Sequence, residues 1–107
     1  MRWEHLQRYY RRKEMTSKER AKLRGIASTE DTIFQLGKGG VTDNFIKSVN
    51  DALEARELIK FRVLESALVS PRVVAEEVAE ATDSIVVTVI GSKVVLYRKG
   101  EKNKFDL

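Results

Sequence analysis

The stretch Gly37-Lys38-Gly39-Gly40 combines residue types that can hold a phosphate group. Glycines leave the main chain unobstructed and accept positive φ angles, so backbone N–H groups can approach an anion closely. Lys38 adds a full positive charge. Residues 32–36, before the loop, are β-prone, and Thr42, after it, can cap a helix whose first turn attracts anions. A strand, a loop and a helix in this order predict a phosphate-binding turn.

Two interpretations of this loop stay open on its residues alone. Many glycine-rich turns only reverse the chain, whereas the GXXG loop of KH type clamps single-stranded nucleic acid by its backbone. A P-loop is excluded because no Gly-Lys-Ser/Thr follows four residues after a first glycine. A dinucleotide fingerprint is excluded because the third glycine is missing. We therefore expect no nucleotide and no other cofactor.

The charged residues are segregated along the chain. Residues 1–24 hold nine Lys/Arg against three Asp/Glu, and residues 91–107 hold five against two, whereas residues 25–90 hold six against eleven. Basic ends of this kind suit a polyanionic partner. Each basic residue that could add a phosphate contact also fits an ordinary solvated surface. These candidates are Lys18, Lys22, Arg24, Arg98 and Lys99.

Composition excludes several other classes of protein. The 107 residues, 42% of them hydrophobic, are expected to form one domain. The absence of cysteine and the single histidine, His5, argue against a metal site. The longest apolar run falls far short of the roughly 20 residues that a membrane-spanning helix needs, and no secretory segment stands out, so a cytoplasmic location is expected. Glu76 and Glu77 point apart on a helix and no hydroxyl has a histidine base other than His5, so neither an enzyme nor a small-molecule substrate is expected.

Start and stop signals divide the chain into seven elements. Thr16 and Glu19 form a capping box, and Ser70-Pro71 places a hydroxyl cap before a proline at the first helical position. A tight turn at residues 91–93 joins the last two strands. The expected helices are 16–28, 42–56 and 70–81, and the expected strands are 32–36, 58–64, 84–90 and 94–98. This α-β-α-β-α-β-β order predicts a compact, two-layer α/β domain with a mixed four-stranded sheet.

Hydrophobic spacing predicts which side chains face the core. On the last helix the expected inward residues are Val74, Val78 and Ala81. Alternation in strand 58–64 puts Lys60 and Arg62 on the opposite side from its apolar residues, and we expect that side to be solvent-accessible or functional.

Two segments flank the predicted domain at residues 16–99. Residues 1–15 form a basic amphipathic helix or arm, in which Trp3, Leu6 and Tyr10 recur at helical spacing. These aromatic residues could stack on bases, but a stripe of this kind more often packs on a neighbouring surface. Residues 100–107 form a polar tail.

Three segments resemble the CRM domain, the family of chloroplast RNA splicing and ribosome maturation that includes stand-alone bacterial proteins of YhbY type. They are Gln35-Leu36-Gly37-Lys38-Gly39-Gly40-Val41-Thr42, Ala52-Leu53-Glu54-Ala55-Arg56-Glu57-Leu58-Ile59-Lys60 and Val89-Ile90-Gly91-Ser92-Lys93-Val94-Val95-Leu96-Tyr97-Arg98. The resemblance spans about residues 16–99. It implies a fold like the C-terminal domain of translation initiation factor three. It further implies a GxxG loop for RNA and association with ribosomal RNA in large-subunit precursors.

These observations give one functional hypothesis and one rival. The hypothesis is a monomeric RNA-binding protein in which the first domain helix, the GKGG loop and the start of the Thr42 helix form one basic concavity for an RNA backbone. The rival is a protein-interaction module, in which the N-terminal arm docks on a partner and the loop is only a turn.

Overall fold

The computed structural model describes residues 15–107. In chain order the elements are α2 (Ser17–Ala27), β1 (Phe34–Leu36), α3 (Asp43–Arg56), β2 (Leu58–Val63), the short 3-10 helix η1 (Glu65–Ala67), α4 (Pro71–Thr82), β3 (Ile85–Ile90) and β4 (Lys93–Tyr97). This is the predicted order with η1 added. The expected N-terminal helix or arm lies outside the described residues.

Within residues 15–107, each α-helix begins at a hydroxyl side chain that accepts a backbone hydrogen bond. Thr16 and Glu19 bond reciprocally, each side chain accepting from the other's N–H at 3.0 Å. Thr42 Oγ1 accepts from Phe45 N–H at 3.1 Å, and Ser70 Oγ accepts from a first-turn N–H of α4 at 3.2 Å. These bonds satisfy N–H groups that lack an intrahelical partner, which confirms the predicted helix starts.

The sheet is mixed and four-stranded, with the order β1-β2-β4-β3. β1 is parallel to β2, and α3 forms the crossover between them. The other two strand pairs are antiparallel. Gly91, at a φ of 58°, stands in the tight turn that joins β3 to β4. The predicted α/β class and mixed sheet are confirmed.

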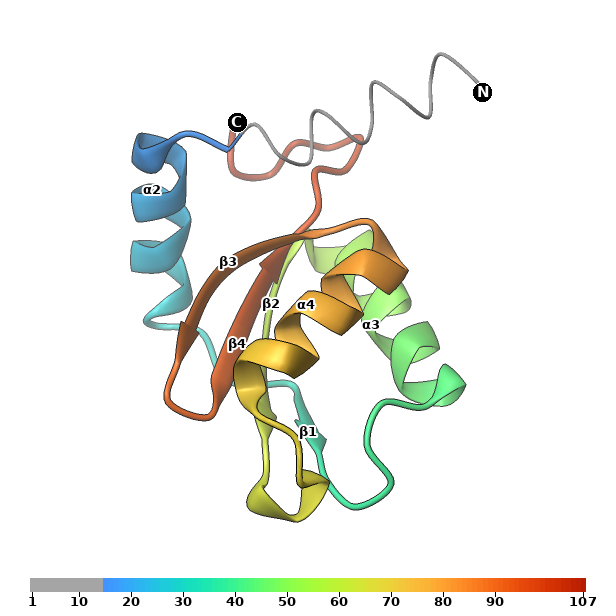
Figure 1. Ribbon diagram of the computed structural model, residues 1–107. Helices are drawn as coiled ribbons and strands as arrows, with labels where there is room; N and C mark the ends of the chain where they lie inside the picture. Colours follow the sequence, from blue (N-terminus) through green and yellow to red (C-terminus); the bar gives the residue numbers. More distant parts are fainter. Residues whose placement is uncertain (1–14) are drawn as a thin grey trace.

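Helices cover both faces of the sheet (Figure 1). Val94 and Leu96 of β4 belong to the larger core under α3 and α4, whereas Val95 and Tyr97 belong to a smaller core under α2. Side chains alternate along a strand, so consecutive residues of β4 serve opposite cores. The layering is therefore helix, sheet, helix, and it differs from the two layers expected.

Three details of the predicted burial are corrected. α4 buries Ala75 and Ala79 beside Val74 and Val78, while Ala81 is exposed, so the inward stripe is rotated from the expected one. The side of β2 that carries Lys60 is covered by α2 and is only partly exposed. Lys60 Nζ donates to the carbonyl oxygens of Ala27 and Glu30, at 3.0 and 3.1 Å, so it caps the end of α2 rather than facing solvent.

The C-terminal segment, expected only as a polar tail, packs on the domain. Phe105 and Leu107 lie against the core under α2. Lys22 Nζ donates to the Phe105 carbonyl oxygen at 2.6 Å, and the Lys104 N–H donates to Glu57 Oε1 at 3.1 Å. These contacts complete the α2 side of the molecule.

Candidate nucleic-acid interface

The Gly37–Gly40 segment is a closed turn. The Gly40 N–H donates to the Gly37 carbonyl oxygen at 3.1 Å, with Lys38 and Gly39 at the centre of the turn. Gly39 has a φ of +100° and Gly40 a φ of +66°. Side chains rarely adopt these angles, so two consecutive positions of this turn require glycine.

The two sides of the turn differ in the space around them. A Cβ at Gly37 would lie 3.3 Å from Ser66 Oγ and 3.5 Å from Leu64 Cδ1, so this glycine packs against the segment that follows β2. A Cβ at Gly39 or Gly40 would meet nothing within 4 Å. The backbone of these two residues therefore stands open to an approaching ligand, and Lys38 is exposed beside them.

The N-terminus of α3 adds donors next to the turn. Aligned peptide dipoles give this end a partial positive charge, and the Thr42 hydroxyl satisfies one of its free N–H groups. The hydroxyl proton of Thr42 remains able to donate. Asp43, also exposed and in the first turn, carries the opposing charge, so an anion is favoured on the Lys38 side of the loop.

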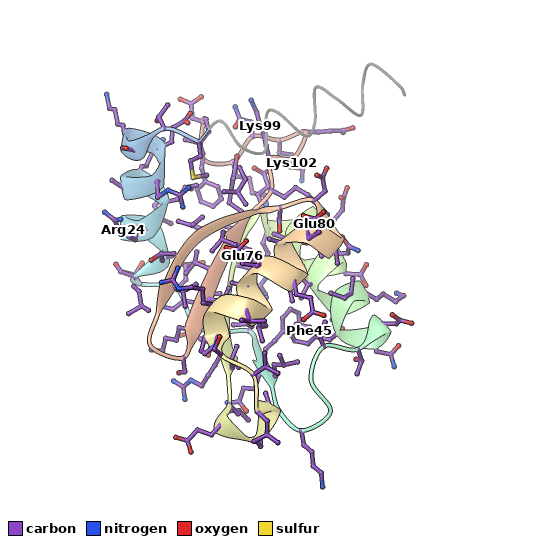
Figure 2. The ribbon with its side chains drawn as sticks, viewed as in Figure 1. Arg24, Phe45, Glu76, Glu80, Lys99 and Lys102 are labelled. Atoms are coloured by element: carbon purple, nitrogen blue, oxygen red, sulfur yellow. The ribbon has the colours of Figure 1, made fainter. Side chains whose placement is uncertain are left out.

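Aromatic packing and a backbone hydrogen bond hold the segments on either side of the turn in place. Phe45, in the first turns of α3, packs edge-on against Phe34 of β1 and Phe61 of β2, with ring centroids 6.0 and 5.4 Å apart (Figure 2). The Leu64 N–H donates to the Leu36 carbonyl oxygen at 2.8 Å. The loop is thus held on a rigid base, which limits the entropy that a bound ligand would cost.

The basic residues of α2 do not share a concavity with this loop. α2 packs on the sheet face opposite to α3, and Figure 2 shows Arg24 pointing outward on that side. Lys18 and Lys22 are exposed on α2, although Lys22 already donates to the C-terminal segment. The expected single concavity is therefore corrected: loop and helix present separate basic surfaces.

The last two predicted contact residues lie away from the loop. Arg98 donates to Asn50 and Thr82, and its side chain is 24% exposed. Lys99 is exposed, and Figure 2 shows it with Lys102 at the end of the molecule opposite the β1–α3 loop of Figure 1. Of the ten predicted residues, the structure brings five together, namely Gly37, Lys38, Gly39, Gly40 and Thr42.

Sequence reasoning missed exposed residues in and after the connection from η1 to α4. Arg72 is exposed in the first turn of α4, directly after the proline that begins the helix. Leu68 and Val69 are exposed in the connection between η1 and α4. The signal available in the sequence was two bulky apolar residues immediately before the Ser70 helix cap, where a turn usually carries polar residues.

Two further classes of site receive no support from the described residues. Across residues 15–107, no three His, Cys, Asp or Glu side chains are grouped so that they could hold a metal ion. The helices within the same range are too short or too polar to cross a membrane.

Comparison with known proteins places this geometry in a family. The sequence pattern of the CRS1/YhbY (CRM) domain matches residues 15–98. The Bacillus subtilis protein named probable RNA-binding protein YqeI is 44% identical over 90 residues, covering 84% of this chain and 94% of the relative. Probable RNA-binding protein MJ0652 of Methanocaldococcus jannaschii is 34% identical over 92 residues, covering 84% of this chain and 68% of the relative.

A solved structure has the same fold. The solution structure of a Staphylococcus aureus protein, titled as a candidate RNA-binding protein, has a TM-score of 0.70 and 43% sequence identity. The match covers 85% of this chain and 95% of the other. The fold, the matched sequence pattern and these relatives agree, and the chain belongs to the CRS1/YhbY (CRM) domain family.

Proposed function

We propose that this domain binds RNA by its backbone, with the GKGG loop holding phosphate oxygens. The observation that carries the proposal is the open main chain at Gly39 and Gly40, where a Cβ would meet nothing within 4 Å. Lys38 supplies charge, and the α3 N-terminus, which follows the loop, supplies oriented N–H groups. Such contacts are independent of base identity.

The relatives support the RNA partner. Two are named probable RNA-binding proteins and a third, from Haemophilus influenzae, is named an RNA-binding protein. None of these names describes an enzyme, and we propose a binding role without catalysis. The resemblance to the ribosome-maturation family leads us to propose ribosomal RNA in large-subunit precursors as the ligand, met in the cytoplasm by a monomer.

Basic residues outside the GKGG loop are proposed to add to RNA binding. Lys18, Arg24 and Lys99 are exposed, and none of them lies at the GKGG loop. We propose that they contact phosphates of more distant RNA segments, so that their contributions add to that of the loop. Lys22 and Arg98 are bound to other parts of the protein and would contribute less.

The direct experiment compares two loop variants on a fragment of large-subunit ribosomal RNA. Gly39→Asp places a carboxylate in the open space, and Lys38→Glu reverses the charge at an exposed position with no change of backbone. Each should weaken binding roughly tenfold or more. Ala81→Asp adds the same charge at an exposed position of α4 and is the control.

The two results separate the proposal from its rival. A loss of affinity in both loop variants, with Ala81→Asp close to wild type, would support the loop site. Unchanged affinity in folded Lys38→Glu protein would leave the loop as a structural turn and favour the protein-interaction module. Sedimentation of the protein with large-subunit precursors on a sucrose gradient tests the ribosomal part.

A further inference from the structure

The exposed large apolar side chains of the described region gather near one end of the sheet. They are Leu68, Val69, Val73 and Ile90, with exposed fractions of 90%, 40%, 55% and 62%. The first three lie in or just after the connection from η1 to α4, and Ile90 ends β3 at the hairpin turn. A hydrogen bond of 2.7 Å from the Val63 N–H to the Ser92 carbonyl oxygen joins the end of β2 to that turn.

A shallow hollow of about 330 Å³ lies between these segments. Its wall is mostly apolar, with polar groups from one carboxylate, one hydroxyl and the backbone of the hairpin turn. The lining residues are Val63, Leu64, Glu65, Val69, Pro71, Gly91 and Ser92.

Leu64 lies between the hollow and the GKGG loop, whose residues do not line the hollow. Leu64 lines the hollow, and its N–H donates to the Leu36 carbonyl oxygen directly before the loop. A Cβ on Gly37 would touch Leu64 Cδ1 at 3.5 Å. A chain whose phosphates lie at Gly39 and Gly40 would reach the hollow by crossing Leu64.

Leu68 ends η1, and its N–H donates to the Glu65 carbonyl oxygen at 3.0 Å. Its φ is +59°, in the left-handed region, and its side chain is 90% exposed. A bulky residue there costs on the order of 1 kcal/mol compared with glycine or asparagine, and it gains almost no burial in return. This exposed leucine directly precedes Val69, which lines the hollow, so its side chain is available for contact with a ligand there.

We propose that the hollow accepts an unstacked base of single-stranded RNA, an inference that rests on the proposed phosphate contacts of the loop. Leu64 and Val69 offer apolar contact to the face of the base, and Leu68 covers it from the neighbouring turn. The Glu65 carboxylate accepts hydrogen bonds from exocyclic amino groups, which cytosine, adenine and guanine carry and uracil lacks. The hollow has room for one or two bases. It is too small to serve as a stable protein interface, which buries about 1,200–2,000 Å² of surface.

The test uses three labelled probes of equal length at one salt concentration. They are a cytidine-rich RNA, a uridine-rich RNA and a ribose-phosphate oligomer without bases, each measured by fluorescence anisotropy. Wild-type protein should bind the cytidine-rich RNA roughly five- to tenfold more tightly than the baseless oligomer. Glu65→Gln should reduce the preference for cytidine over uridine.

The decisive variant is Leu68→Asn, alone and with Val69→Ser. Asparagine adopts the left-handed conformation readily, so the single variant should melt at or above the wild-type temperature. Both should lose roughly threefold or more on the cytidine-rich RNA and nothing on the baseless oligomer. Ala21→Ser, on the exposed side of α2, is the control and should bind all probes as wild type does.

The outcomes distinguish the proposed base site from the proposed phosphate site at the GKGG loop. Equal binding of RNA and baseless oligomer by wild-type protein, with both weakened by Lys38→Glu, would overturn the base site and leave the loop site standing. Leu68→Asn protein that bound the cytidine-rich RNA as tightly as wild type would also overturn it. Unchanged binding of all probes by Lys38→Glu would instead refute the loop site.

Discussion

The Arg98 guanidinium donates a hydrogen bond to Asn50 Oδ1 at 2.8 Å. It also donates to the Thr82 carbonyl oxygen at 2.8 Å and to the Asn50 carbonyl oxygen at 3.2 Å. One side chain thus joins the end of β4 to α3 and to the last turn of α4. Arg98, a candidate for phosphate contact in the sequence, is therefore hydrogen-bonded within the protein.

Replacing Arg98 should therefore change stability more than RNA binding. Arg98→Ala leaves partly buried acceptors at Asn50 and Thr82 unsatisfied, and it should lower the free energy of unfolding by about 2 kcal/mol. Its affinity for RNA should stay within about twofold of wild type, because the loop is untouched. Urea denaturation and an RNA titration measure the two effects, with the exposed Arg56→Ala as control. A large loss of affinity at unchanged stability would return Arg98 to the RNA site.

Features that depend on contacts between residues close in sequence were predictable, whereas features that depend on distant contacts were not. The helix starts at Thr16, Thr42 and Ser70 were predictable, because each cap bonds to an N–H three residues away. The GKGG turn was predictable for the same reason. The placement of α2 on the other sheet face was not, because its amphipathic pattern does not say which face it covers.

The roles of individual basic residues could not be predicted from the sequence either. Arg98 bonds to Asn50 and Thr82, which are 48 and 16 residues away, and Lys22 bonds to a carbonyl 83 residues away. No local pattern distinguishes such a residue from one that faces solvent. The hollow beside the loop likewise combines residues from β2, η1, α4 and the hairpin turn.

Tyr97 should make the protein sensitive to alkaline pH. Burial, followed by the charges of Glu57 and Glu19, raises the pKa of the Tyr97 phenol from 10.0 to about 12. The unfolded chain then loses this proton at lower pH than the folded chain. The contribution of Tyr97 to stability is complete below pH 10 and is lost as the pH rises to about 12, by up to about 2 to 3 kcal/mol.

Tyr97→Phe isolates this effect from the titration of lysines. The Tyr97 hydroxyl is buried without a hydrogen-bond partner, so its removal should leave stability at pH 7 unchanged or raise it by about 1 kcal/mol. Denaturation of both proteins at several pH values from 8 to 12 should show an added loss only in wild type. Parallel curves for the two proteins would contradict the raised pKa.

Lys60 should stabilise α2 from across the chain. Its ammonium group meets the carbonyl oxygens of Ala27 and Glu30 at the C-terminal end of the helix, where a cation is favoured. Lys60→Met keeps most of the apolar stem, and it should cost about 1 kcal/mol. Hydrogen exchange should become faster in the last turn of α2 and remain unchanged in α4. Equal protection of α2 in both proteins would show that the cap contributes nothing.

The salt dependence of RNA binding tests the loop site most directly. Each phosphate that a lysine neutralises adds to the slope of log affinity against log salt concentration. Lys38→Ala should weaken binding and reduce the magnitude of this slope by about 1, on the same ribosomal RNA fragment. Arg56→Ala removes an exposed charge at the opposite end of α3 and should leave the slope unchanged. An unchanged affinity and slope in folded Lys38→Ala protein would contradict phosphate binding by the GKGG loop.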